Sequence, residues 1–238
     1  MNILITGASS GIGEAILEKL AKNNNVLVLA RNTGKIQLPN VRWINVDLSK
    51  TEELEELVQT IEEFKCDILI NNAGAGRVKE LENLDMQEMV DESVLNLITP
   101  MKLTSIVAKN MKENNFGRII NISSISGLSG TPYLFTYSAT KAGLINFTRS
   151  SADYFKGYNI TVNTICPGGV DTDMAVNGRQ EISKLLDLEP EQYQKNMLKA
   201  MGRDSLISTE EVASLVEFLI NMPSINGQCI NICGLIEK

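Results

Sequence analysis

The sequence predicts an α/β protein in which a doubly wound, seven-stranded parallel sheet carries helices on both faces. Strand-like apolar runs alternate with helical patterns along the 238-residue chain, as in proteins built from β-α-β units. The runs are continuously apolar, which is typical of strands buried on both faces. A glycine-rich turn also joins the first strand to the first helix, and sheets of this kind bind ligands beyond the carboxyl ends of their strands.

Each expected element follows from its local pattern. The strands are short apolar runs at residues 2–6, 26–30, 41–46, 67–71, 118–122, 160–165 and 229–232. The helices have apolar residues every three or four positions, at about residues 11–24, 50–64, 86–113, 137–155 and 209–220. We expect Thr209 to be the N-cap of the last helix, with Glu210 and Glu211 in its first turn.

Length and composition favour a single domain over residues 1–238. This length is near the upper end of what one hydrophobic core supports, and 43% hydrophobic with 21% charged residues is ordinary for a globular protein. The least regular stretch, about residues 175–208, is too long for a routine connection. We expect it to form a lid over the substrate site.

Composition also excludes several functions. The net charge is −7, from 22 basic and 29 acidic residues, which disfavours nucleic acid and anionic membranes as partners. The chain has no histidine, so Ser-His-Asp and Cys-His catalysis are excluded. The four cysteines form no CxxC pair, and we expect free thiols and no metal site. With no leader segment and no run of 18 apolar residues, we expect a cytoplasmic protein.

The turn at residues 6–13 reads TGASSGIG and predicts a dinucleotide site. Gly7 permits a sharp turn, Gly11 lets the backbone approach a pyrophosphate, and Gly13 permits close packing of helix on sheet. The helix N-terminus offers free N–H groups and partial positive charge to phosphates. Its place between strand and helix favours this interpretation over a purely structural turn. The expected cofactor contacts here are Gly7, Ser9, Ser10, Gly11, Ile12 and Gly13.

A second motif is YSATK at residues 137–141. Tyr137 and Lys141 are four residues apart and share one helix face. Ser124 follows the fifth strand, with Ser123 as an adjacent competitor, and Asn96 lies inside the preceding long helix. Each residue also has a structural interpretation: a helix kink for Asn96, a turn for Ser124, packing for Tyr137 and a solvated charge for Lys141.

Together with the GxxxGxG spacing of the glycine turn, these residues resemble the single-domain branch of the short-chain dehydrogenase/reductase family, from residue 1 to about 234. The resemblance implies a Rossmann-type fold and hydride transfer between a nicotinamide cofactor and a carbonyl or alcohol carbon. It implies that Tyr137 is the acid/base and that Lys141 holds the nicotinamide ribose. It also implies that Ser124 orients the substrate oxygen and that Asn96 supports a water relay.

The chemistry agrees with this assignment. Hydride addition builds negative charge on the carbonyl oxygen, which requires a proton donor and a hydrogen-bond partner. The ordinary pKa of tyrosine, about 10, is too high for efficient proton exchange at neutral pH. We therefore expect the Lys141 ammonium and an oxidised nicotinamide to lower the pKa of Tyr137.

Further turns resemble cofactor-binding turns of the family. NNAG at residues 71–74 would lie against the adenine ribose, an acidic residue after the third strand would contact adenine, and PGGVDT at residues 167–172 would fix the carboxamide. The residues so implied are Asp47, Leu48, Asn72, Ala73, Gly74, Pro167, Gly168, Val170 and Thr172, in addition to Tyr137 and Lys141.

The end of the second strand bears on the choice of cofactor. An acidic residue there binds the 2′-hydroxyl of NAD, whereas a basic one accepts the extra phosphate of NADP. The usual acidic position is Ala30, and Arg31 follows it. NADP-dependent relatives often carry a second basic residue in the glycine turn, where this chain has Ser10. We favour NADP(H) over NAD(H), on Arg31 alone.

The substrate is less well defined. Relatives that reduce 3-oxoacyl chains on acyl carrier protein present arginines to the carrier, and the corresponding positions here are Asn115 and Tyr158. We therefore favour a small ketone, aldehyde or alcohol, as in a carbonyl reductase. The carrier-protein reductase and a non-catalytic dinucleotide sensor are the alternatives. Apolar lid residues would either contact the substrate or pack the lid helices: Met174, Leu185, Leu186, Leu188, Tyr193, Met197 and Met201.

The two longest helical segments, residues 86–113 and 137–155, could supply apolar faces for assembly. The family habitually forms tetramers through its two long helices and last strand, so the resemblance implies a homotetramer or a dimer.

Overall fold

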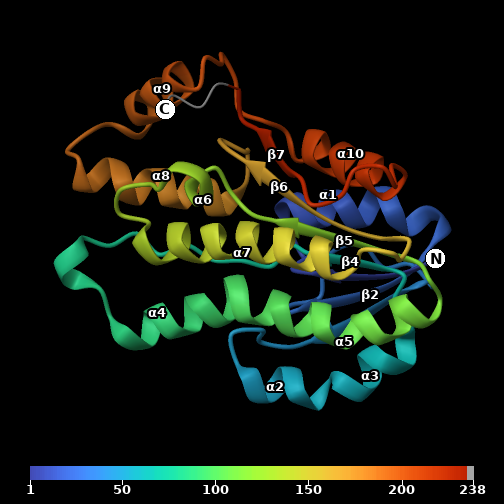
Figure 1. Ribbon diagram of the computed structural model, residues 1–238. Helices are drawn as coiled ribbons and strands as arrows, with labels where there is room; N and C mark the ends of the chain where they lie inside the picture. Colours follow the sequence, from blue (N-terminus) through green and yellow to red (C-terminus); the bar gives the residue numbers. More distant parts are fainter. Residues whose placement is uncertain (235–238) are drawn as a thin grey trace.

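The computed structural model describes residues 1–234; residues 235–238 of the expected domain lie outside the described part. The described strands form one seven-stranded sheet in the order β3-β2-β1-β4-β5-β6-β7 (Figure 1), and all six neighbouring pairs are parallel. The predicted doubly wound parallel sheet is confirmed. The strands are β1 (Asn2–Thr6), β2 (Asn25–Ala30), β3 (Val41–Asn45), β4 (Ile68–Asn71), β5 (Gly117–Ile122), β6 (Ile160–Pro167) and β7 (Cys229–Ile232).

The strand order fixes where ligands bind. β1 pairs with β2 on one side and with β4 on the other. The chain therefore winds outward in one direction from β1 to β3 and in the other from β4 to β7. In sheets of this kind the crevice lies beyond the carboxyl ends of the strands, where the winding direction changes. That point is the carboxyl end of β1 and β4.

One face of the sheet is covered by α1 (Gly11–Leu20) and α10 (Thr209–Ile220), which pack against each other. Alternate residues of the central strands, such as Ile3, Ile5 and Ile70, point to this face and are fully buried. They contact Ile16 of α1 and Val216 of α10 within one apolar cluster. This burial holds the N-terminus of α1 against the end of β1.

The opposite face is covered by α2 (Thr51–Glu56), α3 (Val58–Phe64), α5 (Thr99–Glu113) and α7 (Phe135–Tyr154) (Figure 1). The other set of alternating strand residues, including Leu4 and Leu69, forms a second cluster with Ile61 and Leu103. Burial on both faces explains why the strands are continuously apolar. Among the described helices, none has the length and apolar character that a membrane span requires.

Several predicted boundaries were wrong in detail. The first helix gives way to a 3₁₀ turn at Ala21–Asn23, and the acidic helix is divided into α2 and α3 at Leu57. The N-cap of α10 is Ser208 rather than Thr209, because Ser208 and Glu211 form a capping box. This reciprocal pairing satisfies two N–H groups at once, whereas Thr209 is already the first helical residue.

The segment expected to be irregular contains two helices, α8 (Asp173–Leu185) and α9 (Pro190–Ala200). Thr172 caps α8 by accepting a hydrogen bond from the N–H of Ala175. Both helices lie at the end of the molecule to which the strands point, together with the short α6 (Ser126–Ser129) (Figure 1). A polar composition concealed them in the sequence, since α9 has no buried residue.

Candidate active site

The glycine turn after β1 is open at the helix N-terminus. Gly7 and Gly11 have φ values of 69° and 59°, a region that favours glycine. Ser10 is the N-cap of α1 but makes no side-chain capping bond. The first N–H groups of α1 are therefore available to an anion, as a bound pyrophosphate requires. These residues fit a dinucleotide phosphate.

The turn after β4 is fixed to the glycine turn. The N–H groups of Asn72 and Ala73 both donate to Thr6 Oγ1 at 3.0 Å. Asn72 Nδ2 donates to the carbonyl oxygens of Thr6 and Gly7, at 3.1 and 2.9 Å. A Cβ added at Gly13 would lie 2.5 Å from Asn72 Nδ2, so this contact allows no larger residue at position 13. Two of the predicted cofactor turns thus form one unit.

The turn after β6 closes the same region. A Cβ added at Gly11 would lie 3.2 Å from the Thr172 methyl carbon, so this turn faces the glycine turn directly. Val170 forms an isolated bridge with Ile207, and the carbonyl oxygen of Pro167 accepts a hydrogen bond from Ile125 at 3.0 Å. These bonds fix the path of the chain past Gly168.

Asp47 lies just after β3, and the charge of the exposed Arg31 acts on it. Burial alone would raise the pKa of Asp47, but hydrogen bonds from Ser49 and the charge of Arg31 lower it overall. The side chain of Leu48 lies in the core, and the residue is only 3% exposed. Its carbonyl oxygen accepts a hydrogen bond from the Thr99 hydroxyl at 2.8 Å. The two charged positions therefore lie at one edge of the site.

Asn96 is held in an unusual helical turn. α4 (Met86–Ser93) continues into a π-helical turn, Val94–Ile98, before α5 begins. Such turns are rare and often occur at functional sites. Asn96 is fully buried, and its amide group accepts from the N–H of Ala75 at 3.0 Å and donates to the carbonyl of Ala75 at 2.7 Å. The side chain therefore orders the backbone just beyond Gly74.

Lys141 lies beside Asn96. A Cβ added at Gly74 would be 3.1 Å from Asn96 Oδ1 and 3.3 Å from Lys141 Nζ. Lys141 is 3% exposed, and Nζ donates to the carbonyl oxygen of Ile122 at 2.8 Å. Burial lowers the pKa of this amine to about 8. Its charge is thus retained at neutral pH but lost at mildly alkaline pH.

Tyr137 lies on the first turn of α7, and the Lys141 amine is 5.6 Å from the centre of its ring. A Cβ added at Gly76 would be 3.1 Å from the same ring. The Ser124 hydroxyl acts on the Tyr137 phenol and lowers its pKa. Ser123 does not compete for this role, because its hydroxyl donates to the carbonyl oxygen of Lys141 at 2.9 Å. The structure therefore brings together all four predicted catalytic residues.

The protein groups around Tyr137 raise its pKa overall. Burial raises this pKa, the Ser124 hydroxyl opposes the rise, and the charges of Glu92 and Cys166 add to it. The same burial lowers the pKa of Lys141, so the lysine is less positive at the pH where the phenol would ionise. The expected lowering of the Tyr137 pKa includes the charge of an oxidised nicotinamide, so it stays a prediction for the protein with that cofactor bound.

Sequence reasoning missed one charged group of this region. Glu92 is 2% exposed, and its charge acts on both Tyr137 and Lys141. It is four residues before Asn96, and residues four apart share a helix face. The four-residue spacing between Glu92 and Asn96 is the sequence pattern from which the role of position 92 could have been predicted.

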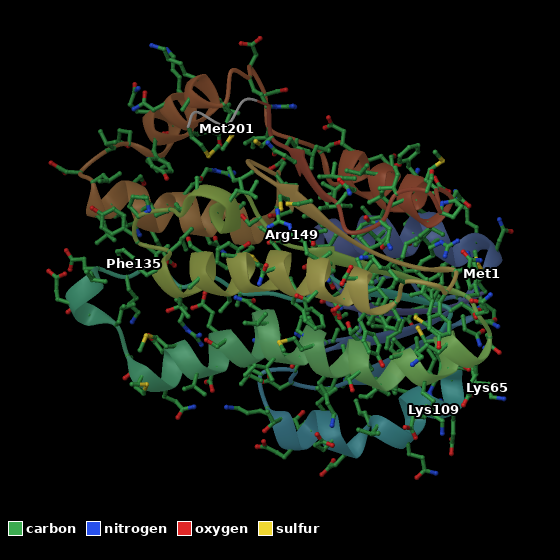
Figure 2. The ribbon with its side chains drawn as sticks, in the orientation of Figure 1. Met1, Lys65, Lys109, Phe135, Arg149 and Met201 are labelled. Carbon is green, nitrogen blue, oxygen red and sulfur yellow. The ribbon has the colours of Figure 1, made fainter. Side chains whose placement is uncertain are left out.

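The lid residues differ in where their side chains lie. The side chain of Met201, labelled in Figure 2, extends from the end of α9 toward the turn after β6. A Cβ added at Gly169 would lie 3.4 Å from its sulfur and 3.5 Å from the Met197 methyl carbon. Met174 and Leu185, by contrast, are 52% and 42% exposed. Only the first pair lies against the turn that bounds the site.

Comparison with known proteins identifies the group to which these features belong. Residues 1–183 match the family model described as short chain dehydrogenase. A 3-oxoacyl-[acyl-carrier-protein] reductase of Rickettsia bellii is 36% identical, over 97% of this chain and 94% of that protein. A putative ketoacyl reductase of Streptomyces coelicolor is 32% identical, over 97% of this chain and 95% of that protein.

Solved structures agree with the sequence comparison. A point variant of actinorhodin polyketide ketoreductase, solved with NADPH, superposes with a TM-score of 0.88 at 30% identity, over 98% of this chain and 95% of that one. A 4-hydroxyisoleucine dehydrogenase mutant, solved with NADH and succinate, gives a TM-score of 0.87 at 30% identity, over 98% of both chains.

Proposed function

The chain belongs to the short-chain dehydrogenase/reductase family and is an NAD(P)-dependent oxidoreductase acting on C=O and CH–OH groups, and we propose that it reduces a small carbonyl compound with NADPH. The observation that supports this proposal most is the buried cluster of Ser124, Tyr137, Lys141 and Asn96. It lies beside a turn whose free N–H groups suit a pyrophosphate.

The proposed mechanism assigns one task to each side chain. The nicotinamide, when bound, supplies the hydride to the carbonyl carbon. The Tyr137 hydroxyl donates a proton to the oxygen of the carbonyl group, and the Ser124 hydroxyl orients that oxygen and stabilises its developing charge. Lys141 then returns a proton to the Tyr137 phenolate, and Asn96 fixes the backbone beside Lys141.

The turns described above are the proposed cofactor site. The pyrophosphate would lie at the N-terminus of α1, held by residues 7–13. The adenosine half would lie against Asn72, Ala73 and Asp47, and the nicotinamide half between Thr172 and Lys141. We further propose that residues 1–238 act as one domain, in which the segment at about residues 175–208, with α9 and most of α8, is the substrate lid.

A carbonyl panel tests the proposed function. Purified protein is incubated with NADPH and a series of small ketones, aldehydes and 3-oxo esters, and the loss of absorbance of the reduced nicotinamide is followed. We expect turnover with at least one apolar ketone or 3-oxo ester. Tight cofactor binding with no turnover across the panel would instead support a dinucleotide sensor.

The preference for NADPH rests on Arg31. Its exposed side chain follows β2, next to Asp47, and a 2′-phosphate would lie within reach of it. The comparisons include one relative solved with NADPH and one solved with NADH. The argument for NADPH is therefore the charge of this side chain.

We predict that Arg31→Asp raises the KM for NADPH about 30- to 100-fold but changes the KM for NADH less than about threefold. A charge-assisted bond to the phosphate is lost and a repulsion is added, whereas a carboxylate can accept a bond from the 2′-hydroxyl of NADH. Steady-state kinetics with both cofactors measure the effect. Arg42→Asp, on the neighbouring strand, is the control for a general change of surface charge. Equal losses for NADPH and NADH would remove the basis for the preference.

The alternative substrate is a 3-oxoacyl chain on acyl carrier protein. The names of the relatives in Rickettsia bellii and Streptomyces coelicolor favour it. At the two positions where carrier-dependent relatives present arginines, this chain has Asn115 and Tyr158. Asn115 Oδ1 accepts a hydrogen bond from the N–H of Asn159 at 3.0 Å, so it has a structural role. Comparing a 3-oxoacyl pantetheine thioester with the same chain on the carrier would distinguish the two substrates.

We also propose a dimer or tetramer, supported by exposed apolar side chains along α4, the π-helical turn that follows it and the start of α5. Met86, Val90, Ile98 and Met101 are 70, 46, 47 and 41% exposed, and such patches commonly mark interfaces.

A cytoplasmic location is supported by four free thiols in the described residues, since free thiols persist in a reducing compartment.

A further inference from the structure

Glu92 is a buried carboxyl group to which the mechanism above gives no task. It lies on α4 and is 2% exposed, and its Oε1 has no hydrogen-bond partner among the described residues. An unpaired buried polar atom costs folding free energy. An apolar residue at this position would avoid that cost, so the carboxyl group requires another explanation.

Glu92 lies on a helix that packs against the helix of the catalytic pair. α4 packs against α7, the helix that carries Tyr137 and Lys141. Glu92 precedes the π-helical turn that presents Asn96. Its negative charge raises the pKa values of both Tyr137 and Lys141, so the carboxylate favours the protonated form of both groups.

The surroundings of Glu92 control its own ionisation. Burial raises its pKa to about 7; the backbone N–H and the charge of Arg77 oppose the rise, the charge of Glu88 adds to it, and Lys141 opposes it. Glu88 is itself paired with Lys79 at 3.0 Å and with Arg77 at 3.8 Å. The carboxyl group is therefore neutral in weak acid and negative in weak base.

On the function proposed above, we propose that Glu92 is a positioning residue whose carboxylate keeps protons on Tyr137 and Lys141, and so maintains carbonyl reduction at alkaline pH. Reduction consumes a proton from Tyr137, and Lys141 restores it. Both groups must therefore be protonated at the start of each cycle. Glu92 gains its negative charge in the pH range where Lys141 begins to lose its proton. The carboxylate therefore forms where it is needed to keep Lys141 protonated.

The test is the pH dependence of kcat/KM in the Glu92→Gln variant, which keeps the shape of the side chain and removes the charge. We expect the alkaline limb of the reduction profile to move to lower pH by about one unit. Activity would then be about tenfold below wild type at pH 9 and within about twofold at pH 6, where Glu92 is already neutral. Asp91→Asn is the matched control. Asp91 immediately precedes Glu92 on α4, but it pairs outward with Lys50 at 3.5 Å.

Several results would overturn the proposal. An equal loss of activity at every pH would indicate a packing role, and the same shift in Asp91→Asn would indicate a general effect of charge. Should Glu92→Gln fail to fold, Glu92→Asp retains the charge, and its alkaline limb is expected to stay within about half a unit of wild type; a full one-unit shift in this variant would also contradict the proposal.

Thermal unfolding separates this proposal from the proposed function, because it needs no substrate. A carboxyl group with a raised pKa binds its proton more tightly when folded, so wild type loses stability as pH rises from about 5 to 7. Glu92→Gln lacks this loss. We expect it to match wild type at pH 5 and to unfold a few degrees higher at pH 8. Equal unfolding temperatures at both pH values would show that Glu92 does not titrate as proposed, whatever the enzyme reduces.

Discussion

Replacing Tyr137 by phenylalanine is expected to lower kcat for carbonyl reduction about 1000-fold or more, and to change the dissociation constant of NADPH less than about threefold. The substitution removes only the hydroxyl group, which is the proposed proton donor, and general acid catalysis of this kind contributes about 10²–10⁴-fold. The ring keeps its packing against Gly76 and its distance from the Lys141 amine. The cofactor turns are unchanged.

Two measurements on the same preparation check this prediction: turnover with the best substrate of the panel, and titration of the variant with NADPH. Tyr133→Phe is the control, since it removes a phenol from the segment that precedes α7. A Tyr137→Phe variant that retains more than about a tenth of wild-type kcat would contradict the assignment of the acid. A comparable loss in Tyr133→Phe would point to the conformation of that segment instead.

Replacing Lys141 by methionine is expected to lower kcat about 100- to 1000-fold and also to weaken NADPH binding about tenfold or more. The amine is the proposed source of the proton that restores Tyr137, and it is also proposed to hold the nicotinamide ribose. Tyr137→Phe should therefore lower turnover without weakening NADPH binding, whereas Lys141→Met should impair both.

Lys141→Met impairs catalysis, but it is not expected to destabilise the fold. The pKa of Lys141 falls from 10.5 to about 8 on burial, so below pH 8 the folded protein bears the full cost of a charge that the unfolded chain solvates. That cost diminishes as pH rises from 8 to 10.5. A shift of this size corresponds to an upper value of about 3 kcal/mol, offset by loss of the bond to Ile122. Lys141→Met is expected to be at least as stable as wild type at pH 7 by denaturant unfolding. Marked destabilisation would indicate a structural role.

Much of the fold was predictable because its signals are local. A continuously apolar strand, a glycine turn and a capped helix are each readable within a few residues. The seven strands and the alternation with helices therefore follow from the sequence. The polar helices α8 and α9 gave no such signal, because they bury few residues. The acidic helix is divided at Leu57, whose side chain packs against the core.

The catalytic set was predictable for a different reason. Four residues at fixed offsets carry a family resemblance, and the structure brings those residues together. The ionisation of the site was not predictable, because it depends on burial and on neighbours distant in sequence. Glu92 and Lys141 are 49 positions apart, and the raised pKa of Tyr137 arises from desolvation that no motif encodes.

The proposed function depends most directly on a dinucleotide site at the N-terminus of α1. We would therefore first titrate the purified protein with NADPH and then with NADH, following the fluorescence of the reduced nicotinamide. We expect saturable binding of one cofactor per chain, tighter for NADPH than for NADH. A protein that binds neither cofactor would contradict the proposed function, together with the proposed roles of Tyr137 and Lys141.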